Sequence, residues 1–153
     1  MSQIPYFPGV LKSELFLVEA RIMAQFMKSY EGPTYAILRI VAGLLFLVHG
    51  SSKLLEFPVP PYAGTPAFVI WVAGIIELVG GALIAIGLFT RWAAFLSSGL
   101  MAAAYWFAHG FDHFFPMVNK GELAALYCFV FLYISARGPG IWAVDSDTPR
   151  PEA

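Results

Sequence analysis

Four stretches of mostly apolar residues, each near the length that crosses a hydrocarbon layer, constrain this chain more than any other feature. They cover about residues 34–55, 66–89, 92–111 and 122–136. A membrane-spanning helix needs about 20 such residues, and the segments between the stretches are rich in proline, glycine or charge, which end helices. Only 12% of the residues are charged, against about 25% in an ordinary soluble domain. The sequence therefore predicts an all-α fold, a four-helix transmembrane bundle.

The segments outside the apolar stretches predict two further regions. Between residues 10 and 30, apolar and charged residues alternate at helical spacing, which is typical of an amphipathic helix lying in the membrane interface. The alternative is a helix that docks on a soluble partner. We therefore expect an N-terminal cytoplasmic or interfacial segment at 1–33, a membrane domain at 34–145 and a disordered tail at 146–153.

The distribution of lysine and arginine predicts the orientation. Positively charged loops stay in the cytoplasm, and the side that carries both termini has most of the positive charges. These are Lys12, Arg21, Lys28, Arg39, Arg91, Arg137 and Arg150, against Lys53 and Lys120 on the other side. Both termini are therefore expected in the cytoplasm. The net charge of −1 offers no basic surface, so nucleic acid is not expected as a partner.

Each apolar stretch carries one stripe of small or polar residues at helical spacing. Small residues let helices approach closely in a membrane, and polar residues avoid lipid, so these stripes should face the interior of the bundle. They comprise Arg39, Ala42, Gly43, Phe46, His49, Gly50 and Lys53; Ala73, Gly74, Glu77, Gly80 and Gly81; Ser98, Met101, Tyr105 and His109; and Glu122, Ala125, Phe129 and Tyr133.

Glu77 is the carboxylate expected deepest in the membrane. At a rise of 1.5 Å per residue, it lies about 16 Å from the outer boundary and His49 lies roughly 12 Å from it. Because a charge at this depth is costly, Glu77 should be protonated or paired with His49 or Lys53. Three interpretations stay open: a polar clamp that fixes helix register, proton or quinone chemistry, and a substrate pathway.

The outer end of the third stretch carries His109, Asp112 and His113. Histidines four residues apart on a helix can share a metal ion, and an aspartate can add an oxygen ligand. Gly110 interrupts this group, and the helix is expected to end there. Aromatic packing with an interfacial hydrogen bond is the alternative, and we assign no metal.

Short motifs follow one another from about residue 34 to residue 145. They are His49-Gly50-Ser51-Ser52-Lys53-Leu54, Glu77-Leu78-Val79-Gly80-Gly81, Gly87-Leu88-Phe89-Thr90-Arg91, His109 with Phe114-Phe115, Gly121-Glu122, and Gly138-Pro139-Gly140 with Asp145. In order and spacing they resemble the DoxX family of small bacterial integral membrane proteins. That family includes a membrane subunit type associated with thiosulfate:quinone oxidoreductase and membrane partners of redox-defence proteins.

The resemblance implies a multi-pass protein of the bacterial inner (plasma) membrane, an accessory or quinone-linked subunit of an oxidoreductase system. Glu77 and His49 would then handle protons, and Arg39 and Lys53 would set the local potential. The remaining candidate binding residues are Tyr105, His109 and Glu122. No cofactor is expected to be resident, and quinone is the candidate ligand.

Two other function classes fit the same sequence. One is a non-catalytic structural or assembly subunit of a larger membrane complex, and the other is a small transporter. The expected partners are the lipid bilayer, other membrane or redox proteins and further copies of the chain. The sequence leaves open whether the chain takes part in catalysis.

Overall fold

The computed structural model describes residues 16–17, 25–110 and 113–145. The chain divides into two compact units, residues 1–32 and 33–153, which are described separately. In the first unit, Phe16 and Leu17 are helical, and a single 3-10 turn, η1, covers Lys28–Tyr30. Most of the predicted amphipathic helix at 10–30, and all of the predicted disordered tail at 146–153, lie outside the described residues.

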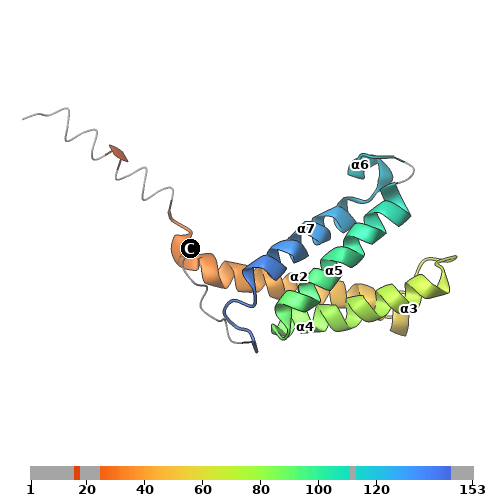
Figure 1. Ribbon diagram of the computed structural model, residues 1–153, viewed down its shortest axis with the longest axis horizontal. Helices are drawn as coiled ribbons and strands as arrows, with labels where there is room; N and C mark the ends of the chain where they lie inside the picture. The colour runs from red at the N-terminus through yellow and green to blue at the C-terminus, as the bar shows by residue number, and fades with distance from the viewer. Residues whose placement is uncertain (1–15, 18–24, 111–112, 146–153) are drawn as a thin grey trace, which may run out of the picture. The chain divides into compact units, whose positions relative to one another are not determined.

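Every regular element among the described residues is helical, which confirms the all-α prediction (Figure 1). The elements are α2 (Glu31–Leu55), α3 (Ala67–Ile75), the π-helical turn η2 (Ile76–Gly80), α4 (Gly81–Ile86), α5 (Thr90–Ala104), the π-helical turn η3 (Tyr105–Gly110), α6 (Pro116–Asn119) and α7 (Glu122–Arg137). Within the described part of the chain, two helical runs are long and apolar enough to cross a membrane, Lys28–Leu55 and Ala67–Ile86.

Glycines bring α2 into backbone contact with the run from α3 to α4. A Cβ atom on Gly43 would lie 2.6 Å from the backbone nitrogen of Ala85, and one on Gly81 would lie 2.5 Å from that of Leu47. Small residues permit this close approach between apolar helices. The predicted inward stripes of these two helices are largely confirmed, because their small residues are buried together. These are Ala42, Gly43, Gly50, Ala73, Gly74, Gly80 and Gly81.

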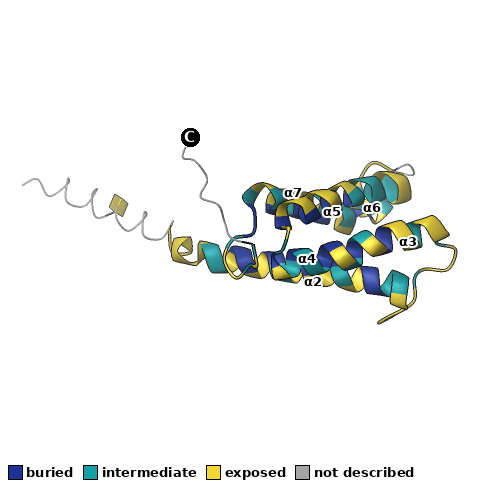
Figure 2. Ribbon diagram, turned by 60° about the horizontal axis from the view of Figure 1, so that its bottom comes forward, coloured by how far each residue is buried: buried dark blue, intermediate teal, exposed yellow. Residues whose placement is uncertain are grey.

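Helix α7 lies alongside α5 and also contacts α2 (Figures 1 and 2). The Ser98 hydroxyl on α5 donates to the Cys128 carbonyl at 2.8 Å. The rings of Phe46 on α2 and Phe131 on α7 pack edge to face, with centroids 4.7 Å apart. These contacts form the core that α7 shares with α5 and α2.

The inward stripe predicted for α7 is wrong. Phe129 is 70% exposed and Tyr133 is 50% exposed, and Glu122 is also exposed. The buried residues of α7 are Tyr127, Phe131 and Ile134. Because α7 is apolar around most of its circumference, helical periodicity gave no contrast between its faces. Its contacts with α2 and α5 set which face is inward.

After α7, the chain folds back over the end of α4. The backbone N–H groups of Val144 and Asp145 donate to the carbonyls of Ile86 and Gly87 at 3.1 and 2.8 Å. Gly87 has a φ angle of +74°, and a Cβ atom there would collide with Ala143. A glycine is therefore required at this turn.

Candidate functional site

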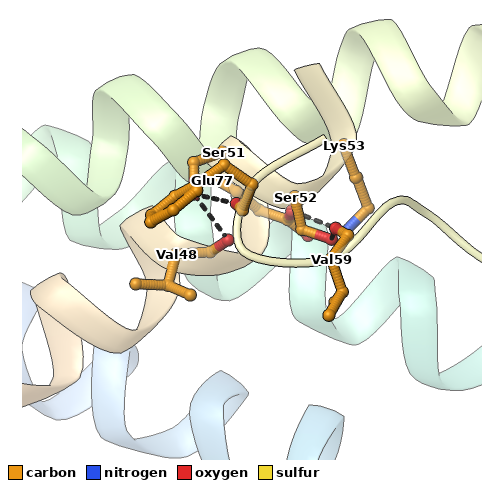
Figure 3. Close-up of polar contacts among 7 residues, drawn as sticks. Val48, Ser51, Ser52, Lys53, Val59 and Glu77 are labelled. Atoms are coloured by element: carbon orange, nitrogen blue, oxygen red, sulfur yellow. Dashed lines mark hydrogen bonds and ion pairs between the residues drawn. The ribbon is translucent and has the colours of Figure 1, made fainter. Parts of the chain in front are cut away.

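Lys53 on α2 and Glu77 in η2 form a mostly buried ion pair (Figure 3). The Lys53 Nζ and Glu77 Oε2 atoms are 2.6 Å apart, and the two side chains are 20% and 5% exposed. Of the two partners predicted for Glu77, the structure selects Lys53. Glu77 lies in a π-helical turn, which holds more residues than an α-helical turn. Such turns are rare and are frequently found at functional sites.

Two serines hold the loop that follows α2 close to this ion pair. The Ser51 hydroxyl lies 2.9 and 2.8 Å from the carbonyl oxygens of Val48 and Phe57, which share its one donor. The Ser52 hydroxyl donates to the Val59 carbonyl at 2.7 Å (Figure 3). The sequence analysis noted these serines only as parts of a motif. Their hydrogen bonds fix the chain on both sides of Lys53.

His49 lies at the margin of the predicted inward stripe. It is exposed, and its ring meets the Tyr127 ring of α7 edge to face, with centroids 6.4 Å apart. The structure therefore places His49 on the α7 side of α2, whereas Glu77 faces α2 from η2. The proton-handling roles of His49 and Glu77 stay predictions.

Arg39 lies at the other end of α2 from Lys53. The 14 residues between their positions correspond to about 21 Å along the helix axis. Arg39 is fully buried, and its guanidinium donates to backbone carbonyls of the described residues. The acceptors are Ile84 and Ala85 at 2.7 and 2.8 Å, and Ile141 and Trp142 at 3.3 and 2.7 Å.

The carbonyls of Ile84 and Ala85 belong to the last turn of α4. Such carbonyls lack partners within their own helix, and a cation there also meets the negative end of the helix dipole. Arg39 thus joins α2, α4 and the C-terminal segment. Its predicted role in binding stays a prediction.

Tyr105 and His109 belong to a second polar cluster, around η3. The Tyr105 hydroxyl donates to the Phe114 carbonyl at 2.6 Å, and His109 Nδ1 lies 3.0 Å from the Asn119 carbonyl. The Asn119 side chain donates to the His113 carbonyl at 2.7 Å. Asn119 was not among the predicted residues, although an asparagine shortly before a glycine is a common turn signal.

Two of the three side chains considered as metal ligands in the sequence, His109 and His113, belong to the described residues. No group of three side chains suited to a metal ion occurs among the described residues, and Asp112 lies outside them. The hydrogen bond of His109 agrees with the alternative prediction for this segment. Glu122 is exposed at the start of α7 and, within the described part of the chain, forms no hydrogen bond or ion pair with Lys53 or Glu77.

These features define a class of protein: a small all-α chain with apolar helices and a buried ion pair between two of them. The DoxX family model matches residues 34–110. An uncharacterized protein of Haemophilus influenzae is 44% identical over 126 residues, which cover 78% of this chain and 94% of that protein. This chain belongs to the DoxX family and is a membrane protein.

A second relative carries a name that refers to activity. This Bacillus subtilis protein is named as a candidate oxidoreductase, CatD, and is 41% identical over 68 residues. The match covers 42% of this chain and 50% of the relative. No solved structure matches the chain.

Proposed function

We propose that this protein is a quinone-linked accessory subunit of a membrane oxidoreductase system. The observation that carries the proposal is the ion pair between Lys53 and Glu77, held at 2.6 Å between two apolar helices. Lys53 retains 20% exposure, so the chain does not fully enclose the pair on the lysine side. The name of the Bacillus subtilis relative supports the redox assignment.

The proposal includes four transmembrane helices in the bacterial inner membrane, with both termini in the cytoplasm. Two observations support this arrangement. The Tyr35 hydroxyl near the start of α2 donates to the Gly138 carbonyl just after α7, so the first helix begins where the last one ends. The predicted cytoplasmic side also carries most of the positive charges, as cytoplasmic loops do.

The chemistry of quinone suits this ion pair. Reduction of a quinone takes up protons together with electrons, and a carboxylate within reach can hold and pass on a proton. Ionisable groups inside a membrane are rare and commonly mark proton paths. In this proposal a partner protein delivers the electrons, and Glu77 supplies protons to quinone.

An assembly subunit is the second candidate function. It is favoured by the polar contacts away from the ion pair, because these bind backbone atoms and hold helices together. Arg39 is the clearest case, with four backbone carbonyls as acceptors. In this alternative, the pair of Lys53 and Glu77 would also only fix the helices.

Glu77→Gln distinguishes the two functions, because it keeps the shape of the side chain and removes its charge. The measurement is quinone-dependent electron flow in membranes that lack the native chain and carry each variant. We expect a loss of about 100-fold or more for Glu77→Gln, the usual scale for a lost proton donor. The exposed Glu56 in the following loop gives the matched control, Glu56→Gln, which should behave as wild type.

Equal electron flow in Glu77→Gln and wild type would contradict the quinone-linked role. If the larger complex also failed to assemble without this chain, the assembly role would be supported.

A further inference from the structure

His49 is a polar residue on an apolar part of the surface of α2. Its exposed neighbours along the helix include Leu45, 53% exposed, and Val48, 42% exposed. His49 lies six residues before the end of α2, or about 9 Å inside it. In the proposed membrane arrangement, its imidazole therefore reaches the depth of the acyl chains, where an unpaired polar group is costly.

Tyr127 provides a second polar group beside His49. Its ring stacks on that of Phe131, with centroids 5.3 Å apart and an angle of 16° between the planes. The ring of Phe46 also lies against the ring of Tyr127, and the two ring centroids are 5.8 Å apart. Tyr127 is 7% exposed, and within the described residues no hydrogen bond to its hydroxyl is formed. A tyrosine hydroxyl in such surroundings usually has a partner.

The two residues lie close to the ion pair. Lys53 follows His49 by four residues on α2, which places both on the same side of the helix. Tyr127 with His49, and Lys53 with Glu77, thus form two contacting pairs one helical turn apart on α2, here called the row. The row leads from the edge of the α2–α7 contact to the buried carboxylate.

We infer that His49 and Tyr127 form the docking point for the ring of a quinone that enters from the membrane. The imidazole N–H and the phenol O–H would donate hydrogen bonds to a quinone carbonyl oxygen, and the neighbouring aromatic rings would pack against the quinone ring. The inference rests on the proposed function and adds to it the position of the ligand and a binding residue, Tyr127. A ring docked there would lie about one helical turn, roughly 6 Å along α2, from Lys53.

The chemistry of the surroundings identifies the class of ligand. The neighbouring exposed side chains are aliphatic, so the ligand must dissolve in lipid. The row presents hydrogen-bond donors and aromatic faces, so the ligand needs acceptor oxygens and a flat ring. A quinone has all three properties, whereas an acyl chain has no acceptor to offer at this depth.

Tyr127→Phe tests the inference, because it removes only the hydroxyl and keeps the stacked ring. The matched control is Tyr133→Phe, on the same helix, where the side chain is 50% exposed and meets the Tyr35 ring. The full chain is placed in lipid nanodiscs, and the equilibrium binding of radiolabelled decylubiquinone is measured. Tyr127→Phe should weaken binding about ten-fold, the effect of one lost hydrogen bond, while Tyr133→Phe should bind as wild type does.

His49→Leu provides a second variant, since this residue is exposed and its replacement should not disturb folding. It should weaken binding to a similar degree. An azide-bearing analogue of the same quinone, activated by light, should label the peptides that contain His49 or Tyr127.

The outcomes separate the two levels of the proposal. Wild-type affinity in Tyr127→Phe and His49→Leu, with labelling elsewhere on the chain, would overturn the docking point and leave the proposed function standing. An absence of quinone binding to the wild-type chain would overturn both. Weakened binding in both variants, with the control unchanged, supports the docking point.

Discussion

The two ends of the contact between α2 and the helical run from α3 to α4 hold buried cations in different ways. At one end, Arg39 is fully buried and donates to four backbone carbonyls. At the other end, Lys53 is partly exposed and pairs with the carboxylate of Glu77. Backbone carbonyls cannot titrate, whereas a carboxylate can gain or lose a proton. The arginine end therefore serves the fold, and the lysine end can also serve proton chemistry.

The largest effect is expected from Arg39→Leu. The change removes the donor shared by these carbonyls. The Ile84 carbonyl keeps the Gly87 N–H at 3.2 Å, and each buried carbonyl left unpaired costs about 1–3 kcal/mol. The free energy of unfolding should fall by at least about 3 kcal/mol, measured by denaturant unfolding in detergent micelles.

Arg91→Leu is the matched control for Arg39→Leu. Arg91 also donates to backbone carbonyls, those of Ser135, Ala136 and Arg137, but it is exposed. Water can replace its bonds, so its loss should cost less than about 1 kcal/mol. Equal losses of unfolding free energy in the two variants would show that burial does not change what such an arginine contributes to stability.

Replacing both partners of the ion pair together should lower stability less than replacing Lys53 alone. Lys53→Met alone leaves Glu77 without its cation and should cost about 2–3 kcal/mol. The double variant with Glu77→Leu should be within about 1 kcal/mol of wild type, since an apolar pair of similar size replaces a buried ion pair at little cost. A double variant less stable than Lys53→Met would show that the pair is needed for folding, as Arg39 is.

A glycine contact close to the ion pair allows a smaller effect to be measured. A Cβ atom on Gly50 would lie 2.6 Å from the Leu78 Cα atom and 2.8 Å from the carbonyl carbon of Glu77. Gly50→Ala should therefore push η2 away from α2 and lower stability by about 1–2 kcal/mol. Gly99 on α5 has open space around its Cα atom, so Gly99→Ala should keep or raise stability, by up to about 1 kcal/mol.

The smallest effect concerns Asp145 at the arginine end. Its carboxylate accepts hydrogen bonds from the Thr90 backbone N–H at 2.9 Å and the Thr90 hydroxyl at 3.1 Å. The backbone hydrogen bond is the main cause that holds the pKa of Asp145 below its usual range. Because the folded-state pKa is lowered, this contribution is present above the unfolded-state pKa of about 4. It is lost as the pH falls through the folded-state pKa.

Asp145→Asn isolates that contribution, since asparagine also caps helices well but does not titrate. At neutral pH its stability should stay within about 1 kcal/mol of wild type. Between pH 7 and pH 3 the melting temperature of the variant should fall less than that of wild type. Identical falls in the two proteins would assign the acid sensitivity to other groups.

The helical ranges could be predicted from the sequence because prolines, glycines and charges separate the apolar stretches. The shared face of Glu77 and its glycine neighbours could also be predicted, since polar and small residues contrast strongly with leucine and isoleucine. The buried face of α7 could not, because Phe129 and Phe131 look alike in sequence and only tertiary contacts distinguish them. Periodicity also carried no signal for the backbone acceptors of Arg39, which lie far along the chain.

The wide turn at Ile76–Gly80 has a consequence for how such proteins can diverge. A π-helical turn inside an α-helix contains more residues than the regular turn it replaces, so the gain or loss of a single codon could create or erase it. The helices on either side of the turn would keep the same residues on their buried faces. Evolution could therefore reposition the carboxylate of Glu77 by an in-frame insertion or deletion, with no substitution in the packed core.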